Sequence, residues 1–518
     1  MKSETLRDAL ERHAAARPDA PFLFAPETGR MLSYAELERQ ARLLARFLAA
    51  MGLAKGDKVG LFLHNAYQTA ALFLGSMIGG YVCAPFNLLA QRSQLAYVLA
   101  HSECKVLFTA RDHESRVAQA LPPSGGPQVI VIDPDAPGLF LEERLPPFPA
   151  LPLAAGDTAL LMYTSGTTGT PKGALLSHAN LIASARSVSQ WHGLNRADRV
   201  LSALPLYHIN GQCIATLSTL YSGGAIVLPH RFSVHEWWNL VDRYQVTWIN
   251  MVPTIIAYLL NAVGSAAGRH YPSVRFGRSA SAPLPPEQHQ EFERIFGIPV
   301  IEAMGMTECG STVFANPQDP ARRKYGSPGV PCGVEAKVVG PDGRELSPGE
   351  TGEILLRGRN VMLGYYKAPE LTAQAIDRGG WLRTGDLGYR DAEGFYFITG
   401  RLKELIIKGG ENIAPREIDE ALLKHPAVLE AAAVGVPDAA YGQEIFACVV
   451  LKAGHQCSEA ELRTFCLTEL GRYKTPKRIR LLDELPKGPS GKVQRLKLVS
   501  AAGDFAQDVS TGGGNRLD

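Results

Sequence analysis

The sequence predicts an α/β fold with a large N-terminal region of mixed, mostly parallel sheets flanked by helices, a strand-rich subdomain, and a small α+β region at the C-terminus. Short apolar runs alternate with helix-patterned segments over residues 58–109 and again over 177–300, which is typical of βαβ units. Glycine turns separate strand-like runs over 326–400. From residue 401 onward, short helices and strands alternate on a smaller scale.

In the first alternation, we expect strands at 58–63, 81–84 and 104–109, with helices at 67–78 and 93–102. The apolar stretch 68–90 has about the length needed to span a bilayer. Its Gly79-Gly80 pair, Pro85 and Asn87 instead favour a buried helix, a turn and a strand.

Farther along, residues 111–156 are rich in Pro and Gly and are expected to be mainly loop. A strand at 158–163 precedes a second strand that starts at 173 and runs into a helix. The remaining expected elements are strands at 225–228, 246–250, 298–301, 428–436 and 444–451, and helices at 234–243, 415–424 and 459–470. The tail 510–518 is expected to be disordered.

Composition predicts a soluble globular protein of two or more domains, because 518 residues exceed what one hydrophobic core usually serves. The net charge of +2 gives no reason to expect nucleic acid as a partner, and membrane insertion is not expected. Eight cysteines without a C-x-x-C pair imply neither a zinc site nor a disulfide framework. The charged N-terminal segment excludes a secretory signal, so the cytoplasm is the expected compartment.

The segment 163–178, YTSGTTGTPKGALLSH, predicts a phosphate-binding loop. Gly166 and Gly169 allow close approach of an anion to the backbone, and Lys172 adds positive charge. Hydroxyl donors come from Thr164, Ser165, Thr167 and Thr168. The spacing differs from the common P-loop, because Pro and Gly flank the lysine. A solvated Gly/Thr turn is the alternative, and the density of hydroxyls disfavours it.

With this loop, the chain resembles the AMP-forming adenylating enzymes, which include acyl-CoA synthetases, peptide-synthetase adenylation domains and beetle luciferases. Five further motifs follow in order: LPLYH at 204–208, GMTE at 305–308, WLRTGDLG at 381–388, GRLKELIIKGGENIAPREIDEAL at 400–422 and PKGPSGKVQR at 486–495. The resemblance implies an adenylation domain over 1–402 and a small mobile domain over 403–518, with the hinge at Lys403. It also implies ATP, Mg²⁺ and CoA as cofactors.

The resemblance assigns catalytic roles to Lys172, His208, Thr307, Glu308 and Lys492. Glu308 would ligate Mg²⁺, Thr307 would donate to the α-phosphate, and Lys492 would bridge the acid and the α-phosphate. Without the other motifs, a helix cap would explain the Thr-Glu pair and solvation would explain the lysine. The implied ATP/AMP contacts are Thr164, Ser165, Gly166, Thr167, Thr168, Lys172, Ser281, Met304, Gly305, Met306, Thr307, Asp386, Ile398, Arg401 and Lys492.

Asp386 would accept the ribose hydroxyls and Arg401 would add a ribose or phosphate contact. An Asx-turn and a surface ion pair are the alternatives for these two residues. Met304 stands where family members usually place an aromatic ring on adenine, and Ser281 belongs to a Ser-Ala-Ser variant of the usual motif. Gly488 replaces a frequent Thr. These departures affect the adenine-side contacts.

His208 matches a position beside the substrate carboxylate in the resembling family, and a satisfied core histidine is an equal alternative. Its neighbours predict a modest, mainly apolar acid pocket made of His208, Ile209, Asn210, Cys213, Val252, Pro253, Thr254 and Met304. For CoA, the resemblance implies Gly409 and Gly410 at the pantetheine channel and Tyr441, Tyr473 and Lys474 at the nucleotide. Tyrosines that merely pack on their own domain are the alternative.

The reaction implied by the resemblance is ATP-dependent activation of a small or medium carboxylic acid, followed by transfer to CoA. A stand-alone adenylation enzyme that loads a carrier protein is the nearest alternative, and a luciferase-like oxygenase is a further one. A catalytically silent nucleotide-binding regulator is the alternative from another class. The expected partners are the acid and CoA, and a homodimer is left open.

Overall fold

The structure is a computed structural model that describes residues 4–140, 144–164, 171–263, 269–487 and 493–501. The chain divides into two compact units. The first comprises residues 1–284, 288–336 and 356–383, and the second comprises 285–287, 337–355 and 384–518. The boundary expected between 402 and 403 lies inside the second unit and stays a prediction, as does mobility of the C-terminal domain. The C-terminal segment 510–518, which is expected to be disordered, lies outside the described residues.

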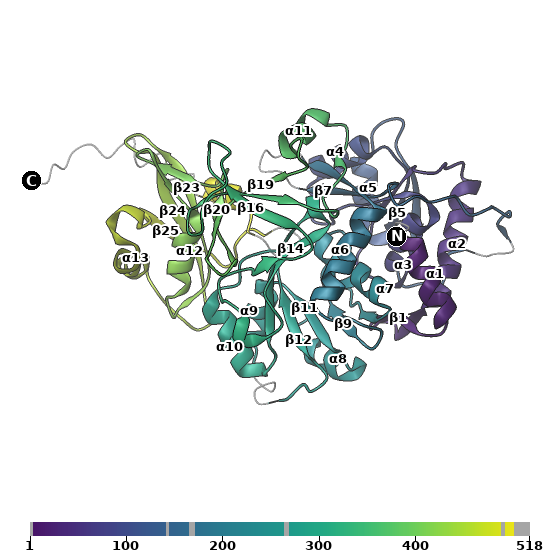
Figure 1. Ribbon diagram of the computed structural model, residues 1–518, viewed down its shortest axis with the longest axis horizontal. Coiled ribbons are helices and arrows are strands. Elements are labelled where there is room, and N and C mark those ends of the chain that lie inside the picture. Colours follow the sequence, from purple (N-terminus) through teal and green to yellow (C-terminus); the bar gives the residue numbers. More distant parts are fainter. Residues whose placement is uncertain (1–3, 141–143, 165–170, 264–268, 488–492, 502–518) are drawn as a thin grey trace, which may run out of the picture. The chain divides into compact units, whose positions relative to one another are not determined.

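The first unit is built on two sheets (Figure 1). The nine-stranded sheet is parallel from β13 to β1, and β14, β15 and β2 are antiparallel edge strands. In spatial order its strands are β15 (Val330–Pro331), β14 (Ser311–Ala315), β13 (Val300–Met306), β12 (Phe276–Ser279), β11 (Trp248–Met251), β9 (Arg199–Ser202), β10 (Ala225–Val227), β1 (Pro21–Ala25) and β2 (Arg30–Ser33).

The seven-stranded sheet is parallel from β7 to β6, whereas β8 is antiparallel to both of its neighbours. In spatial order its strands are β18 (Gly364–Tyr365), β8 (Lys172–Ser177), β7 (Thr158–Thr164), β4 (Val82–Pro85), β3 (Lys58–Phe62), β5 (Cys104–Ala110) and β6 (Gln128–Ile132).

A helical layer lies between the two sheets. α3 (Tyr67–Gly79) contacts β1 of one sheet and β3 and β4 of the other, and α6 (His178–Trp191) contacts β14 and β8. Every residue of α3 is buried, because a helix that is apolar on all sides must be enclosed by its neighbours. α1 (Leu6–Ala16), α2 (Tyr34–Ala50), η3 (Asn210–Leu217) and α7 (Ser218–Ser222) pack beside them.

Other helices bury the outer faces of the sheets. α8 (Trp237–Tyr244), α9 (Pro253–Asn261) and α10 (Pro286–Phe296) pack on the nine-stranded sheet. α4 (Arg92–Ser102) and α5 (Glu114–Ala120) pack on the seven-stranded sheet. The remaining short elements are η1 (Arg111–His113), η5 (Thr307–Cys309), η6 (Pro320–Arg322) and α11 (Pro369–Ala375).

The second unit contains most of a four-stranded sheet and a five-stranded sheet. The first is ordered β16 (Glu335–Val339), β17 (Gly352–Arg357), β19 (Leu382–Arg390) and β20 (Tyr396–Arg401). The second is ordered β22 (Glu411–Ile413), β21 (Ile406–Lys408), β24 (Gly442–Leu451) and β23 (Val428–Asp438), and β25 (Arg478–Leu481) also pairs with β24.

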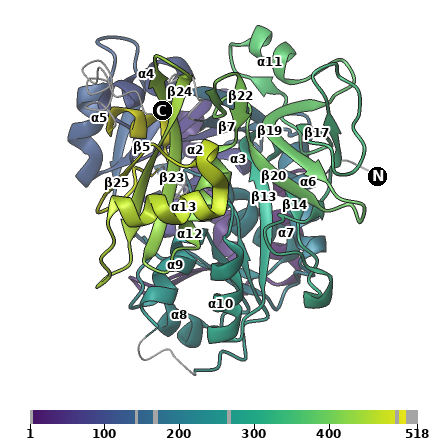
Figure 2. The ribbon, with the colours of Figure 1, turned by 90° about the vertical axis from the view of Figure 1, so that its left-hand side faces the viewer.

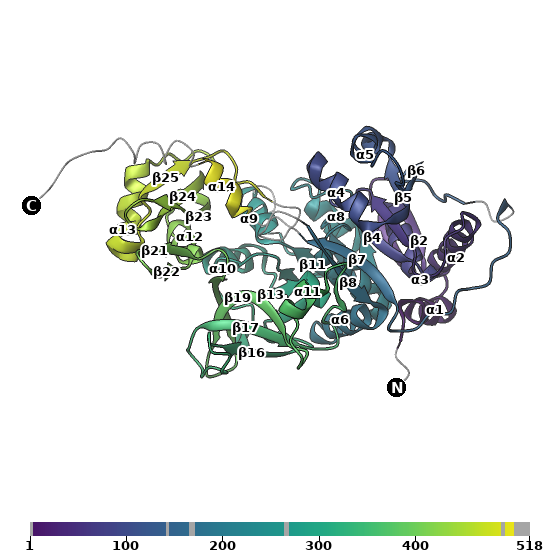
Figure 3. The ribbon, with the colours of Figure 1, turned by 90° about the horizontal axis from the view of Figure 1, so that it is seen from above.

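Alternate residues of β23 and β24 supply two small cores, one on each face of the five-stranded sheet. α12 (Pro415–Leu423) and α13 (Glu459–Lys474) cover one face, and α14 (Arg495–Ala501) covers the other (Figures 2 and 3). This arrangement confirms the expected α+β character of the C-terminal region.

The predicted α/β class and most elements are confirmed, with two differences. The stretch 111–156, expected to be loop, contains α5 and β6. The strand expected at 298–301 begins at Val300 and continues to Met306, because β14 adds an antiparallel partner beyond the parallel register. No helix in the described part of the chain is long and apolar enough to cross a membrane. All eight cysteines are unpaired, and only Cys457 is not buried.

Candidate active site

The hairpin of β7 and β8 carries the predicted phosphate loop between Thr164 and Lys172, which are paired residues of the two strands. The Thr164 hydroxyl donates to the Lys172 carbonyl oxygen at 3.5 Å. Lys172 Nζ lies 5.4 Å from the centroid of the Tyr365 ring, within the range of a cation–π contact. The predicted loop residues Ser165, Gly166, Thr167 and Thr168 lie outside the described residues.

Tyr365 joins this hairpin to the predicted metal ligand Glu308. Its hydroxyl donates to Glu308 Oε1 at 2.9 Å, and its backbone is fixed because β18 pairs with β8. Burial, and then the nearby Glu308 carboxylate, raise the pKa of Tyr365, so the phenol remains a donor. The Glu308 carbonyl accepts from Met362 N at 2.7 Å. The structure thus brings Lys172 to the ring, and Glu308 to the hydroxyl, of one tyrosine.

The GMTE motif lies where β13 ends and the 3₁₀ turn η5 begins. β13 and β14 shift register between Met304 and Gly305. A Cβ at Gly305 would lie 2.4 Å from the Ser311 carbonyl oxygen, so only glycine fits this close approach. Met304, Met306 and Thr307 are half-buried beside it. The GMTE motif therefore packs closely against β14 at Gly305 and ends with Glu308 in η5.

The predicted acid pocket is more polar than expected. Asn210 Nδ2 donates to Ser281 Oγ at 3.1 Å, and Asn250 Nδ2 donates to Asn210 Oδ1 at 3.0 Å. His208 Nδ1 accepts from the backbone N–H of Asn210 at 3.3 Å. Burial lowers the pKa of His208 to about 4, so its imidazole is neutral at pH 7. Ser281 has a φ of 76°, a strained geometry that often marks functional sites.

The other predicted pocket residues lie close to Asn210 and Asn250 along the sequence. Ile209 and Cys213 are buried at the start of η3, and Val252 precedes α9, which begins at Pro253. Thr254 is half-buried in the first turn of α9.

Arg278 is fully buried in β12 and was not predicted as a site residue. It is in register with Asn250 of β11, which is in register with Ser202 of β9, so these side chains point to one face of the sheet. Arg278 Nη2 donates to Thr312 Oγ1 at 2.9 Å, whereas Nε and Nη1 have no hydrogen-bond partner among the described residues. Burial lowers the pKa of Arg278 to about 10, which still leaves it charged at pH 7.

The predicted ribose contacts meet in the second unit. Asp386 and Arg401 are paired residues of β19 and β20, and Arg401 Nε lies 2.7 Å from Asp386 Oδ1. Asp386 Oδ2 is buried without a hydrogen-bond partner in the described part of the chain. An unpaired buried carboxylate oxygen is costly, so this atom suits a hydroxyl donor from a ligand. Ile398 is half-buried on the neighbouring strand.

Three of the five predicted CoA contacts, Gly409, Tyr441 and Tyr473, lie around Lys408. Its ammonium pairs with Glu444 at 2.6 Å and lies over the rings of Tyr441 and Tyr473 at 5.5 and 5.2 Å. Tyr473 also donates to the Lys408 carbonyl oxygen. Gly409 adjoins both tyrosines.

Lys474, Lys403 and Lys492 are the remaining predicted residues of the C-terminal region. Lys474 pairs with Glu417 at 2.7 Å. Lys403 is exposed in the turn between β20 and β21. Lys492 lies outside the described residues.

Comparison with known sequences identifies the family to which this chain belongs. The sequence pattern of the AMP-binding enzymes matches residues 10–366, and that of the AMP-binding enzyme C-terminal domain matches residues 417–492. The chain belongs to the AMP-binding enzyme family.

Similar members of the AMP-binding enzyme family are CoA ligases. A sulfoacetate–CoA ligase of Cupriavidus necator is 54% identical over 508 residues, which cover 96% of this chain and 98% of that protein. An oxalate–CoA ligase of Arabidopsis thaliana is 35% identical over 96% of this chain and 98% of its own length. ATP-bound MatB from Rhodopseudomonas palustris superposes with a TM-score of 0.87 at 31% identity, over 97% of this chain and 100% of that one.

The described residues of this AMP-binding enzyme fit a Mg²⁺ ion. Such ions are usually held by one or two carboxylates together with substrate phosphates. Glu308 offers a hard oxygen ligand, and its Oε2 makes no hydrogen bond within the described ranges, while Tyr365 fixes Oε1. The ion would be held by Glu308 and would neutralise phosphate charge.

Sequence reasoning missed Tyr365, Asn250 and Arg278. The first two lie outside the recognised motifs. Arg278 directly precedes the quoted Ser-Ala-Ser segment, and this position beside a recognised motif was the signal that could have revealed it.

Proposed function

We propose that this protein is an AMP-forming CoA ligase for a small carboxylic acid that carries a second anionic group. A carboxylate oxygen of the acid attacks the α-phosphorus of ATP, and the bond to pyrophosphate breaks. The sulfur of CoA, after its thiol has lost a proton, then attacks the acyl carbon and AMP leaves. CoA ligases among the relatives support both half-reactions.

Arg278 is the observation that carries the choice of acid. A fully buried guanidinium with two unpartnered nitrogens is unfavourable unless an anion neutralises it, and no ion pair forms to it among the described residues. Arg278 is in register with Asn250 of the neighbouring strand. Asn250 donates a hydrogen bond to Asn210, which in turn donates one to Ser281. We infer that His208 and Asn210 face the reacting carboxylate and that Arg278 receives the distal anion. Sulfoacetate and oxalate, named for two relatives, both carry such a second charge.

The experiment measures pyrophosphate release with sulfoacetate, oxalate, acetate and propionate, each with CoA or with a carrier protein as acceptor. We expect the two doubly charged acids to be preferred and CoA to be the acceptor. Arg278→Met should lower kcat/KM for the preferred acid about 100-fold, because a buried charged contact contributes roughly 3 kcal/mol. Activity with propionate should change little.

Arg269→Met is the matched control, because Arg269 is exposed and pairs with Asp242 at the surface. An equal loss for all acids in Arg278→Met would assign this arginine to the fold and not to the acid. Absence of pyrophosphate release with every acid would favour the silent regulator over the ligase.

A further inference from the structure

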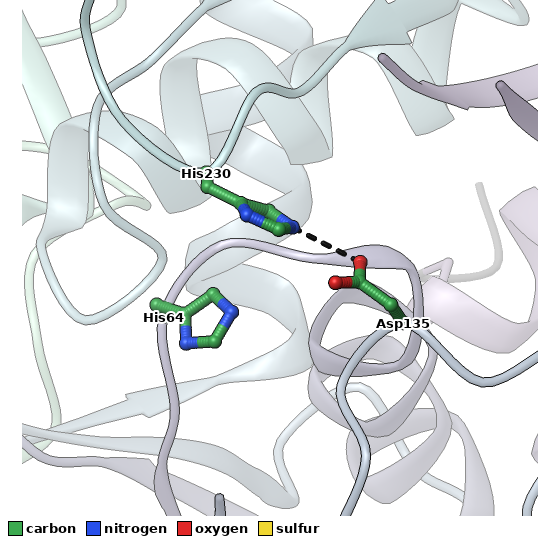
Figure 4. A group of neighbouring side chains, drawn as sticks. All are labelled: His64, Asp135 and His230. Atoms are coloured by element: carbon green, nitrogen blue, oxygen red, sulfur yellow. Dashed lines mark hydrogen bonds and ion pairs between the residues drawn. The ribbon is translucent and has the colours of Figure 1, made fainter. Parts of the chain in front are cut away.

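Three side chains that serve none of the proposed half-reactions meet in the first unit: His64, Asp135 and His230 (Figure 4). One ligand atom of each lies within 4.8 Å of the other two. His230 Nε2 is 3.0 Å from Asp135 Oδ1, and the rings of His64 and His230 meet edge to face with centroids 4.8 Å apart. All three are half-buried and therefore reachable from solvent.

The three residues follow the carboxyl ends of three strands. His64 follows β3, Asp135 follows β6, and His230 follows β10. β3 and β6 belong to the seven-stranded sheet and β10 to the nine-stranded sheet, so the cluster joins the two sheets. Ligands of open α/β sheets bind at such carboxyl ends.

Asn65, next to His64 and buried, fixes the backbone that carries the two histidines. Its Nδ2 donates to the Leu204 carbonyl at 3.1 Å and to the Pro229 carbonyl at 3.4 Å, directly before His230. Its Oδ1 accepts from Leu206 N at 2.8 Å. One buried amide therefore holds both histidine-bearing segments together.

Gln68, four residues after His64 and buried, fixes the third segment. Its backbone N–H donates to the Pro134 carbonyl at 2.8 Å, and its Nε2 donates to the Ala136 carbonyl at 2.9 Å. Asp135 lies between these two anchored carbonyls. The three segments are thus positioned by hydrogen bonds that do not involve the cluster side chains themselves.

Glu27 provides a further oxygen at the same place. Its Oε1 accepts from His230 N at 2.8 Å, and its Oε2 lies 3.9 Å from His230 Nε2. A simple His230–Asp135 ion pair would explain two of the side chains but not His64, whose ring nitrogens make no hydrogen bond to any described residue. A histidine nitrogen within 4.8 Å of a second histidine nitrogen and a carboxylate oxygen suits a metal site.

We propose that His64, Asp135 and His230 bind a divalent cation of the zinc type, with Glu27 or water completing the coordination. Two imidazoles and a carboxylate suit Zn²⁺ or Co²⁺, whereas Mg²⁺ prefers an all-oxygen shell. Bonds of about 2.1 Å require ligand atoms about 3.4 Å apart in a tetrahedral site. The His64 ring would therefore move inward by roughly 1 Å on binding.

Such an ion would stabilise the junction of the two sheets and, through Asn65, the segment Leu204–Leu206 that precedes His208. The test uses the full chain, freed of metal with a chelator and titrated calorimetrically with Zn²⁺ and Co²⁺ in the presence of millimolar Mg²⁺. We expect one equivalent bound at this site and a melting temperature raised by about 3 °C or more. Bound Co²⁺ should show visible absorption without a sulfur charge-transfer band, because no thiolate is among the proposed ligands.

His64→Ala and His230→Ala should each lose this equivalent, while His270→Ala should keep it, since His270 is an exposed histidine outside the cluster. Asp135→Asn, which preserves side-chain size, should weaken binding at least tenfold and serves if an alanine variant does not fold. Binding of no ion by the wild type, or equal binding by the wild type and all cluster variants, would refute the site.

Discussion

Tyr365 shows how one hydroxyl can orient the carboxylate of Glu308, the proposed Mg²⁺ ligand. It donates to Glu308 Oε1 from a strand that is itself paired to the phosphate-loop hairpin. Lys172 packs over the face of the same ring. The direction of Glu308 is therefore set by the hairpin that carries the predicted phosphate ligands, so a metal and a phosphate would be positioned by one structural element.

Replacing Tyr365 with Phe should raise the Mg²⁺ concentration needed for half-maximal pyrophosphate release by about tenfold, the loss typical of an outer-shell partner. Glu308→Gln should reduce the rate far more, because it removes the ligand. Tyr366→Phe is the control, since the neighbouring hydroxyl donates to the exposed Glu103. A Tyr365→Phe enzyme with unchanged Mg²⁺ dependence would show that this hydrogen bond has only a packing role.

Single residues also show which parts of the candidate site could be predicted from the sequence and which could not. The roles of Glu308, Asp386 and Arg401 were predicted because each belongs to a motif, and the structure pairs Asp386 with Arg401 across two strands. Arg278 and Tyr365 are placed by strand register and pairing, which depend on how distant strands align. Such alignment is a tertiary property that short-range patterns do not contain.

At the scale of elements, strand and helix identity followed from local patterning. The helix α3 and the strands β3 and β5 were predicted to within about two residues, because apolar runs bounded by glycine or charge are strong local signals. α5 and β6 were missed because the Pro- and Gly-rich composition around them resembles loop. The extension of β13 depended on β14, a partner found only in the folded sheet.

The glycine turn after β21 leads to a prediction about the CoA half-reaction. Gly409 has a φ of 56°, and an added Cβ would lie 3.3 Å from both Tyr441 and Tyr473. A Cβ added at Gly410, which has a φ of 87°, would meet no other described residue within 4 Å. Gly409→Ala should therefore slow thioester formation from supplied acyl adenylate about tenfold more than Gly410→Ala, because both share backbone strain but only one displaces the tyrosines. Stopped-flow measurement of each half-reaction provides the comparison, and equal effects would place CoA elsewhere.

The start of α6 predicts an acid-sensitive contact. His178 Nδ1 accepts from Leu6 N at 3.3 Å, which links α6 to α1. Burial lowers the pKa of His178 to about 4, below the unfolded value of about 6.5. The unfolded chain therefore binds the proton first as the pH falls, so this histidine destabilises the fold progressively between about pH 6.5 and 4.

Replacing His178 with Gln removes this titration. Between pH 7 and 5, the wild type should lose about 2 kcal/mol more of its free energy of unfolding than His178→Gln does, as measured by urea denaturation. Parallel losses in the two proteins would mean that His178 does not titrate in this range.

At the scale of the whole molecule, the proposed chemistry requires the C-terminal region to serve two half-reactions. The predicted Lys492 would act in adenylation, whereas Gly409 and the tyrosines beside it are expected at the CoA channel. Lys403, the predicted hinge, lies in an exposed turn between β20 and β21, where a change of φ and ψ disturbs few contacts.

Lys403→Pro should slow one half-reaction at least tenfold more than the other, because proline fixes φ at the pivot. Lys492→Ala should abolish adenylate formation and spare thioester formation from supplied adenylate. The two half-reactions are measured separately, as pyrophosphate exchange and as thioester yield. Equal slowing of both steps by Lys403→Pro would argue against rotation at this residue.

The burial of seven of the eight cysteines has a practical consequence for all of these measurements. An aromatic disulfide reagent that reports free sulfhydryls by colour would meet at most one accessible group on the native protein, Cys457. The disappearance of the CoA sulfhydryl can then be followed continuously against an almost constant background. The same reagent would reveal the remaining seven groups as the chain unfolds, so one optical signal reports both turnover and loss of structure.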